Sequence, residues 1–447
     1  MEGLHILKYA VRGIKNIDQW AELSFYKKTI DRRFDIHGYN VKGIYGANGS
    51  GKSALITSVE ILKLLIVDSS YLSNPIAQRE LDALINKKLG KLEICTDFIF
   101  SVKNGMRQYH YEIAIEKDES GKFSIQEECL TEKNVKSHSD SFTVVYQVEK
   151  GELNLIIGSE EGKKLLLDRT KNLLSRASLS SLYFEKHLNN PKDNPDRTYT
   201  QLVVLYMFGY SLFTFMDSED DHTAYYIRDF ITSDSLDETY DMDVIMGLSS
   251  MIKDKPLVVL SPKKNNIVKD DFPVFEKEVE KLNAFLRIFK NDLKGISIDR
   301  KETQEGYVCD LIMNYADYSV NSEFESTGIK KLIALFVYLE NMVNGNIVFI
   351  DEMDSNLHDV YLCALLEYLM EDGKGQLCFT THNIGPMDIL RKNKKSIDFL
   401  SADHRIISWK TNGNYSPAKL YKEGMIEGSP FNVFPFDFLE AFAPDED

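Results

Sequence analysis

The chain has 447 residues, 43% of them apolar, which predicts a folded protein of two lobes with a sizeable core. Its 53 basic and 69 acidic residues leave a formal net charge of −16, which argues against a broadly basic nucleic-acid platform but leaves a local basic groove open. Its five cysteines lie far apart without a CxxC pair, so neither a disulfide framework nor a zinc site is predicted, and a reducing compartment is favoured.

Residues 1–150 are predicted to form the first lobe, with strands around one helix. The start of the chain lacks a basic region followed by a long apolar run, so we expect no signal peptide. Apolar runs at 4–11 and 43–45 flank turns, and residues 53–65 have helical spacing. The later segments KLEICTDFIFSV, QYHYEIAIE and FSIQEECL alternate with a period of two, which predicts antiparallel strands.

Residues 151–290 are predicted to form a helical insertion. The apolar run 201–216 is too short for a comfortable membrane span, and its aromatic residues favour a buried helix. A soluble, cytoplasmic protein without a membrane partner is therefore expected. No sustained heptad pattern is present, which argues against a long coiled coil. Helices are predicted at 163–174, 179–188, 201–216, 224–231, 244–252 and 274–293.

Residues 291–447 are predicted to form the second lobe. A helix near 329–343 precedes the buried strand 347–351, and a second helix near 361–370 precedes the strand 376–381. Two successive β-helix-β steps favour a parallel sheet. The expected fold is therefore α/β, with a mixed sheet, an antiparallel β part and the helical insertion.

The segment GANGSGKS is predicted to be a phosphate-binding loop, because it fits G-x-x-x-x-G-K-[ST] between an apolar strand and a helix. Glycines let the backbone N–H groups point inward, and the helix start adds positive potential. The lysine can reach the outer phosphates, and the serine after it can bind Mg²⁺. The predicted nucleotide-binding residues of the loop are Gly46, Asn48, Gly49, Ser50, Gly51, Lys52 and Ser53.

Three further segments are candidates to complete the site. Asp351 and Glu352 end an apolar strand; beside the loop, Asp351 would hold Mg²⁺ together with Ser53, and Glu352 would polarise an attacking water. His382 ends the next strand, where it would contact a γ-phosphate or orient the water.

The third segment, ESTG, begins a helix. Ser326 is a plausible N-cap, so its hydroxyl and the free N–H groups of the first turn, near Gly328, would form an anion site. An ordinary helix cap is the alternative interpretation of this segment.

Together these segments resemble the ABC-type ATPase heads, the group that includes the SMC and Rad50 proteins. GANGSGKS is similar to their Walker A motif, ESTG to a degenerate signature motif and VFIDE to Walker B. Residues 354–358 are similar to a D-loop, and His382 to the switch histidine. The pattern is most similar to the compact OLD-like and AAA15-type ATPases, including the ATPase subunits of PARIS-type and Septu-type anti-phage systems. Gln78 is only a weak candidate for a Q-loop residue.

The resemblance implies an ATPase that binds ATP and Mg²⁺ and hydrolyses ATP to ADP and phosphate. It also implies a homodimer or higher homo-oligomer, in which the Ser326 helix of one subunit covers the ATP of the other. The segment after His382 is too short for the Toprim nuclease domain of the OLD nucleases. We therefore expect a regulatory ATPase that controls a separate effector, a nuclease or a toxin, in anti-phage defence.

Two other functions stay open at this stage. A DNA-repair or DNA-clamping ATPase would enclose duplex DNA between paired heads, and the basic segment 391–395 supports DNA as a partner. A small-molecule kinase could use the same loop, although the second acid and the ESTG helix are surplus to that need.

Overall fold

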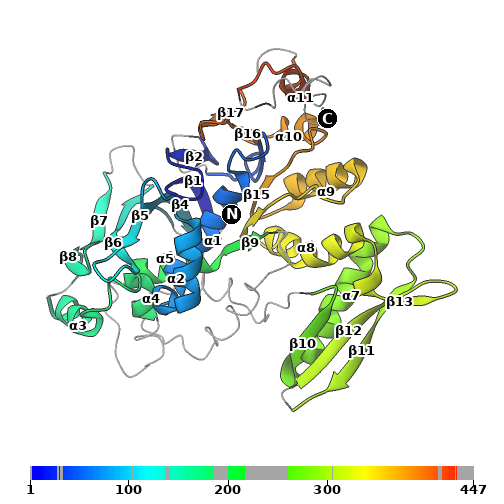
Figure 1. Cartoon of the computed structure of the whole chain (residues 1–447), viewed down its shortest axis with the longest axis horizontal. Helices are drawn as coiled ribbons and strands as arrows, with labels where there is room; N and C mark the ends of the chain where they lie inside the picture. Colours follow the sequence, from blue (N-terminus) through cyan, green and yellow to red (C-terminus); the bar gives the residue numbers. More distant parts are fainter. Residues whose placement is uncertain are drawn as a thin grey trace, which may run out of the picture.

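The computed structural model describes residues 3–27, 30, 34–102, 105–135, 141–158, 160–184, 200–216, 260–304, 306–410, 415–427 and 429. These residues form a seven-stranded antiparallel sheet, a six-stranded mixed sheet and a small antiparallel sheet, with helices packed on and between them (Figure 1). The predicted α/β fold, with a mixed sheet and a separate antiparallel part, is confirmed.

The seven-stranded sheet is antiparallel throughout, in the order β2-β1-β4-β5-β6-β7-β8. Along β4, the alternate residues Leu92, Ile94, Thr96 and Phe98 are buried, while Glu93, Cys95 and Asp97 between them are partly exposed. This alternation places one face of the sheet on the core, as the period of two predicted. The strands are β1 (Gly3–Arg12), β2 (Ala21–Ser24), β4 (Lys91–Val102), β5 (Gly105–Lys117), β6 (Phe123–Asn134), β7 (Thr143–Glu149) and β8 (Glu152–Ile156).

The mixed sheet has the order β17-β16-β3-β15-β14-β9, and its strands are parallel except for β17. Its central strands are buried along their whole length, as expected for a sheet covered on both faces. The predicted parallel arrangement is confirmed. The strands are β3 (Val41–Tyr45), β9 (Leu212–Phe215), β14 (Ile347–Ile350), β15 (Gln376–Thr380), β16 (Ile397–Leu400) and β17 (Ile406–Ser408).

The small sheet stands at one end of the molecule with two long helices against it (Figure 1). Its strands are β10 (Lys264–Val268), β11 (Gly295–Glu302), β12 (Gly306–Asn314) and β13 (Ser319–Asn321), with β12 paired to the other three. α7 (Phe272–Phe289) and α8 (Thr327–Val343) share a hydrophobic cluster with it. α8 also contacts the mixed sheet, so it joins the two parts.

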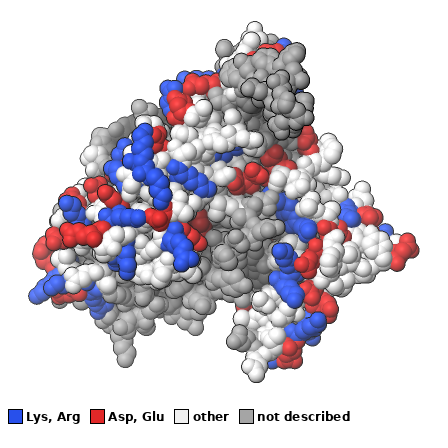
Figure 2. Space-filling view, viewed as in Figure 1, with Lys and Arg blue, Asp and Glu red and all other residues white. Residues whose placement is uncertain are grey.

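On the face in Figure 2, basic and acidic side chains are interspersed over both antiparallel sheets. This face therefore carries no single broad basic field, in keeping with the net charge of −16. No helix in the described part of the chain is long and apolar enough to cross a membrane.

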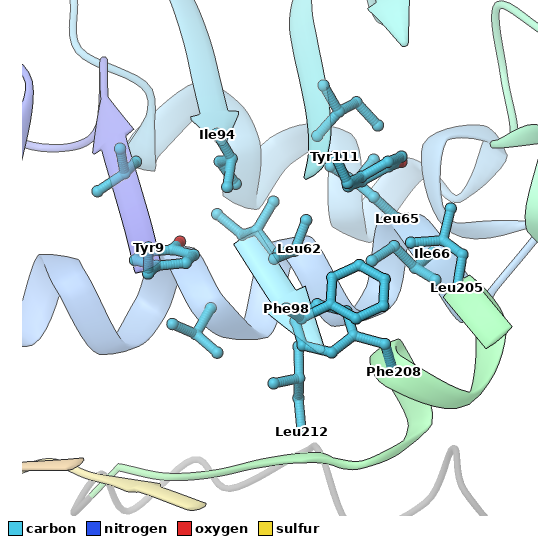
Figure 3. Packing of buried hydrophobic residues seen from close by; sticks show 14 of the residues in the cluster. Tyr9, Leu62, Leu65, Ile66, Ile94, Phe98, Tyr111, Leu205, Phe208 and Leu212 are labelled. Carbon is cyan, nitrogen blue, oxygen red and sulfur yellow. The ribbon is translucent and has the colours of Figure 1, made fainter. Parts of the chain in front are cut away.

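The largest hydrophobic cluster surrounds α1 (Lys52–Val67), between the seven-stranded and mixed sheets (Figure 3). α1 is buried on nearly every side, and its buried residues include the polar side chains of Thr57, Ser58, Glu60 and Lys63 as well as apolar ones. Phe98 of β4 stacks on Phe208 of α5 (Thr200–Tyr210) with ring centroids 4.1 Å apart, and this contact joins the seven-stranded sheet to α5. The other helices of this layer are α2 (Pro75–Leu84), α3 (Glu160–Thr170), α4 (Leu179–Tyr183) and α5 (Thr200–Tyr210).

The opposite face of the mixed sheet is covered by α8 and by helices from the last part of the chain. Their apolar residues form a second cluster with the strands. These helices are α9 (Asp359–Asp372), α10 (Met387–Leu390) and α11 (Pro417–Lys422).

The predicted helix at 201–216 is wrong in its second half, because α5 ends at Tyr210 and β9 follows at Leu212. Both elements are buried, so the apolar run carries no periodicity that separates a buried helix from a buried strand. The range 151–290 also contributes a strand to each sheet, so its described residues are not only helical. The predicted helices at 224–231 and 244–252 lie outside the described residues.

One buried carboxyl group joins the seven-stranded sheet to α4. Glu128 of β6 accepts hydrogen bonds from the Tyr111 hydroxyl (2.9 Å), the Tyr146 hydroxyl (2.6 Å) and the backbone N–H of Leu179 (3.1 Å). Burial outweighs these bonds and raises the pKa of Glu128 to about 7.

Glu128 should make stability depend on pH. A raised folded-state pKa means that the folded protein holds the proton more tightly than the unfolded chain does. The protonated Glu128 therefore contributes its full stabilisation below pH 4.5, and this stabilisation is lost as pH rises towards 7. We expect the free energy of unfolding of the wild type to fall by about 2 kcal/mol more than that of Glu128→Gln between pH 5 and pH 8. Urea unfolding at both pH values measures this, and equal losses would contradict it.

Candidate nucleotide-binding site

Residues 46–51 link β3 to α1 in a tight loop. Gly49 and Gly51 have φ angles of +76° and +106°, which side-chain-bearing residues rarely adopt. Asn16 Nδ2 donates to the Gly49 carbonyl at 2.6 Å, and His404 Nδ1 donates to the Ser50 carbonyl at 2.9 Å. The predicted order of strand, glycine-containing loop and helix is observed, and segments remote in sequence fix the shape of the loop.

Lys52 is buried at the first position of α1. Its Nζ donates to the loop carbonyls of Gly46 (2.9 Å) and Ala47 (3.0 Å). Burial lowers the pKa of Lys52, and Asp351 and Glu352 act in the opposite direction. The lysine therefore lies within electrostatic reach of the two predicted acids.

Asp351 and Glu352 follow β14, which ends at the same edge of the mixed sheet as β3. In the sheet, β15 stands between β14 and β3, the strand that precedes the phosphate loop. The Thr380 hydroxyl at the end of β15 donates to Asp351 Oδ1 at 2.5 Å and accepts from the backbone N–H of Glu352 at 2.8 Å. One residue of the intervening strand therefore orients the Asp351 carboxylate and holds the backbone of Glu352.

Glu352 adopts an unusual backbone conformation, with φ of +46°. Such a conformation costs on the order of 1 kcal/mol or more for a residue with a side chain, and it is found most often at functional sites. Lys331 of α8 donates from Nζ to the Glu352 carbonyl at 3.2 Å and to Ser355 Oγ at 2.8 Å. The Glu352 side chain itself is exposed to solvent.

His382 follows β15 by two residues and is exposed at this sheet edge. Partial burial, followed by the positive charge of Lys52, lowers the pKa of His382, while Asp354, Glu352 and Asp351 act in the opposite direction. The histidine thus shares one electrostatic environment with Lys52 and the acids.

Ser326 caps α8, as predicted, because its Oγ accepts from the backbone N–H of Ile329 at 3.4 Å. Thr327 Oγ1 donates to Asn356 Oδ1 at 3.2 Å, and a Cβ on Gly328 would lie 2.6 Å from the Asn356 carbonyl. The segment therefore packs on the loop after β14 of its own chain. Among the described residues, it makes no hydrogen bond to the phosphate loop, and Ser326 and Thr327 are exposed.

Gln78 lies on α2, where its side chain bonds the backbone of Leu72 (2.7 Å) and both backbone groups of Phe123 (2.8 and 3.0 Å). Its amide is thus engaged in joining α2 to β6. Sequence reasoning missed Thr380, Asn16 and His404. Only Thr380 carried a signal, since it ends the strand that leads to His382.

The site has polar atoms that a bound nucleotide and metal would use. Ser50 Oγ and Asp354 Oδ1 are buried without a hydrogen-bond partner among the described residues. Such groups are costly unless they find a partner, so they fit a site that receives a polar ligand. With the N–H groups of the loop, Lys52, Ser53 and Asp351, these residues fit a nucleoside triphosphate with Mg²⁺.

No protein-family model and no curated protein sequence matches the chain. Solved structures that are similar include an Smc head bound to the C-terminal winged-helix domain of ScpA, with 12% identity and a TM-score of 0.40 over 91% of this chain and 98% of that one. An Smc head domain with a coiled coil and joint, derived from Pyrococcus yayanosii, has 12% identity and a TM-score of 0.36 over 95% of this chain and all of that one.

Thr380 offers a direct test of the site. We expect Thr380→Val to raise the Mg²⁺ concentration needed for nucleotide binding by about 10- to 100-fold, because Asp351 loses the donor that orients it. Nucleotide binding without Mg²⁺ should change little. Thr380→Ser keeps the hydroxyl and serves as the control. Titration of a fluorescent ATP analogue at several Mg²⁺ concentrations measures binding with and without the metal. Equal Mg²⁺ requirements in Thr380→Val and Thr380→Ser would contradict the role of the Thr380 hydroxyl.

Proposed function

We propose that the chain is an ABC-type ATPase that binds magnesium-ATP at the carboxyl edge of the mixed sheet, pairs through it and hydrolyses it. The observation that carries this proposal is the Thr380 hydroxyl, which orients Asp351 and the strained Glu352 at the sheet edge that also bears the phosphate loop. A loop alone would support any phosphate ligand, whereas two adjacent acids at the same sheet edge support hydrolysis.

Each residue has a distinct role in this proposal. The loop N–H groups and Lys52 hold the phosphates, and Ser53 and Asp351 hold Mg²⁺, which supplies charge stabilisation of the reacting phosphate. Glu352 accepts a proton from the attacking water, since its exposed carboxylate is free to face a ligand. His382 contacts the terminal phosphate from the next strand end.

Pairing of two chains is supported by the exposed start of α8. Phe324, just before the cap, is 76% exposed, and Val360 at the start of α9 is 66% exposed. A second chain that docked on the starts of α8 and α9 would remove both apolar side chains from water. In a homodimer, Ser326 and Gly328 of one subunit would present free N–H groups to the phosphates of the other.

A role in regulating a separate nuclease or toxin, in anti-phage defence, is the biological setting that we propose for this ATPase. It rests on the resemblance of GANGSGKS, ESTG and VFIDE to compact defence ATPases. Co-purification of a second protein with this chain from its native operon would test it, and isolation of the chain alone would count against it.

Substitution of Glu352 by Gln tests the proposed hydrolysis. We expect ATP binding to persist while phosphate release falls by about 10²- to 10⁴-fold, because the water loses its proton acceptor. Dimers should accumulate with ATP. Glu371→Gln, the same change at an exposed position of α9, serves as the control. Undiminished hydrolysis would contradict the role of Glu352. Formation of ADP by the wild type that requires a small-molecule acceptor and yields no free phosphate would instead indicate a kinase.

Substitution of Ser326 by Arg tests pairing across the nucleotide. In the Glu352→Gln background, the added bulk and charge at the start of α8 should abolish the ATP-dependent dimer in light scattering. ATP binding by the single subunit should stay within about twofold, although loss of the cap costs about 1 kcal/mol of stability.

Ser416→Arg, which puts the same side chain at the start of α11, is the control for Ser326→Arg. Unchanged pairing of Ser326→Arg would contradict the shared site. Loss of ATP binding by its monomer would indicate that Ser326 serves its own subunit.

A DNA-binding ATPase is a second candidate, because one pocket is strongly basic. The pocket, of about 360 Å³, lies at the amino edge of the mixed sheet, opposite the phosphate loop. Lys394, Lys395 and Lys410 form no ion pair with a described carboxylate. Cations beside an indole ring suit nucleic acid, whose phosphates and bases they would contact. The lining residues are Lys27, Tyr39, Arg391, Lys392, Asn393, Lys394, Lys395, Ser396, Ile397, Trp409 and Lys410.

The pocket has its own optical reporter. The chain has two tryptophans, so Trp20→Phe leaves Trp409 as the single indole. If the pocket binds DNA, a short oligonucleotide should quench its fluorescence, and the affinity should fall steeply with salt. Lys394→Glu with Lys395→Glu should abolish the quenching, whereas the equally charged Lys87→Glu with Lys88→Glu should not. Absence of quenching, or equal losses in both double variants, would contradict DNA binding here.

A further inference from the structure

A cluster of potential metal ligands lies on the face of the seven-stranded sheet that is turned away from the core. On β4, Cys95 and Asp97 alternate with buried residues, and on β5 the outward positions are His110 and Glu112. The antiparallel register places Cys95 opposite Glu112 and Asp97 opposite His110. Residues 13 and 17 positions apart in the sequence thereby become neighbours.

The donor atoms have the spacing of a metal site. Cys95 Sγ lies 3.8 Å from His110 Nε2, and Nε2 lies 2.9 Å from Glu112 Oε1. The three donor atoms all lie within 4.8 Å of one another. A tetrahedral Zn²⁺ would separate its sulfur and nitrogen ligands by about 3.5 Å and its nitrogen and oxygen ligands by about 3.3 Å. Small side-chain rotations would therefore bring the three donors around one ion.

Asp97 completes the arrangement from behind the histidine. Its Oδ1 lies 2.5 Å from His110 Nδ1, on the side of the ring opposite to the donor Nε2. Metal-binding histidines typically donate their second N–H to a carboxylate, which fixes the tautomer and the ring orientation. Phe142 covers the ring edge-on, with centroids 6.2 Å apart.

A redox role does not explain the cluster equally well. The nearest outward cysteine on the sheet is Cys129 of β6, which is paired with Glu112 on the far side of β5. Two strand spacings separate Cys95 from Cys129, about 10 Å between their Cα atoms, whereas a disulfide needs less than about 7 Å. A bridge between these two thiols would therefore require the sheet to open.

We propose that Cys95, His110 and Glu112 bind a transition-metal cation, most readily Zn²⁺, with a water in the fourth position and with Asp97 orienting His110. A thiolate, an imidazole and a carboxylate together select Zn²⁺ over Mg²⁺ and Ca²⁺. The site is separate from the proposed Mg²⁺ site, which lies on a different sheet. By joining β4 to β5 on their outward face, the metal would stiffen the sheet that packs on α1.

The test uses the full-length, tag-free chain, freed of metal with a chelator and kept in excess Mg²⁺. Titration with Co²⁺ should produce the visible absorption of a tetrahedral site and a thiolate-to-cobalt band in the near ultraviolet, saturating at one ion per chain. Zn²⁺ should then displace the Co²⁺ and remain bound through gel filtration.

Matched variants identify the ligands. Cys95→Ser should remove the thiolate band, and His110→Ala should abolish Co²⁺ binding. Cys363→Ser, at a half-buried cysteine of α9, should leave both unchanged. Circular dichroism of each metal-free variant separates loss of a ligand from loss of the fold, and Glu112→Gln replaces any variant that fails to fold. A spectrum without a thiolate band, or one that Cys95→Ser leaves intact, would overturn the proposal.

Discussion

The parallel pairing of β3, β15 and β14 is the constraint on which the proposed nucleotide-binding site depends. Parallel neighbours end at the same edge of a sheet, so Lys52, His382 and Asp351 converge although long stretches of chain separate them. The register matters as much as the order. A slip of one residue in β15 would turn Thr380 to the opposite face of the sheet and leave both acids without their shared hydroxyl.

Buried polar contacts hold that register. The Gln376 side chain, at the start of β15, accepts from the Ile6 backbone N–H (2.7 Å) and donates to the Ile6 carbonyl (2.9 Å). β15 is thereby tied to the seven-stranded sheet at one end and to the acids at the other. On the far side of β3, Lys42 forms a buried ion pair of 2.6 Å with Asp398 of β16. A different alignment of these strands would separate the two residues and leave a buried charge without its partner, which is strongly unfavourable, so the ion pair opposes such an alignment.

The motif residues and the parallel sheet were predictable, because a phosphate loop and strand-helix alternation have clear sequence patterns. The strand order was not, since nothing local shows that β15 separates β3 from β14. β9 was hidden in an apolar run that also suited a helix. The cluster at Cys95 and His110 could not be predicted either. Cysteine spacing indicates ligands that lie in one loop, whereas these ligands become neighbours only through strand register.

α8 gives the proposed pairing a physical link to catalysis. Its first turn carries Ser326, and its Lys331 holds the Glu352 carbonyl and Ser355. The left-handed backbone at Glu352 is unfavourable on its own and persists because Thr380 and Lys331 hold it from two sides. A partner that closes on Ser326 would therefore act on the same helix that positions Glu352. A ligand shifts the equilibrium between separate chains and a closed pair only if it binds one of these states more tightly. ATP would therefore favour the closed pair to the extent that it contacts both α8 of one chain and the phosphate loop of the other.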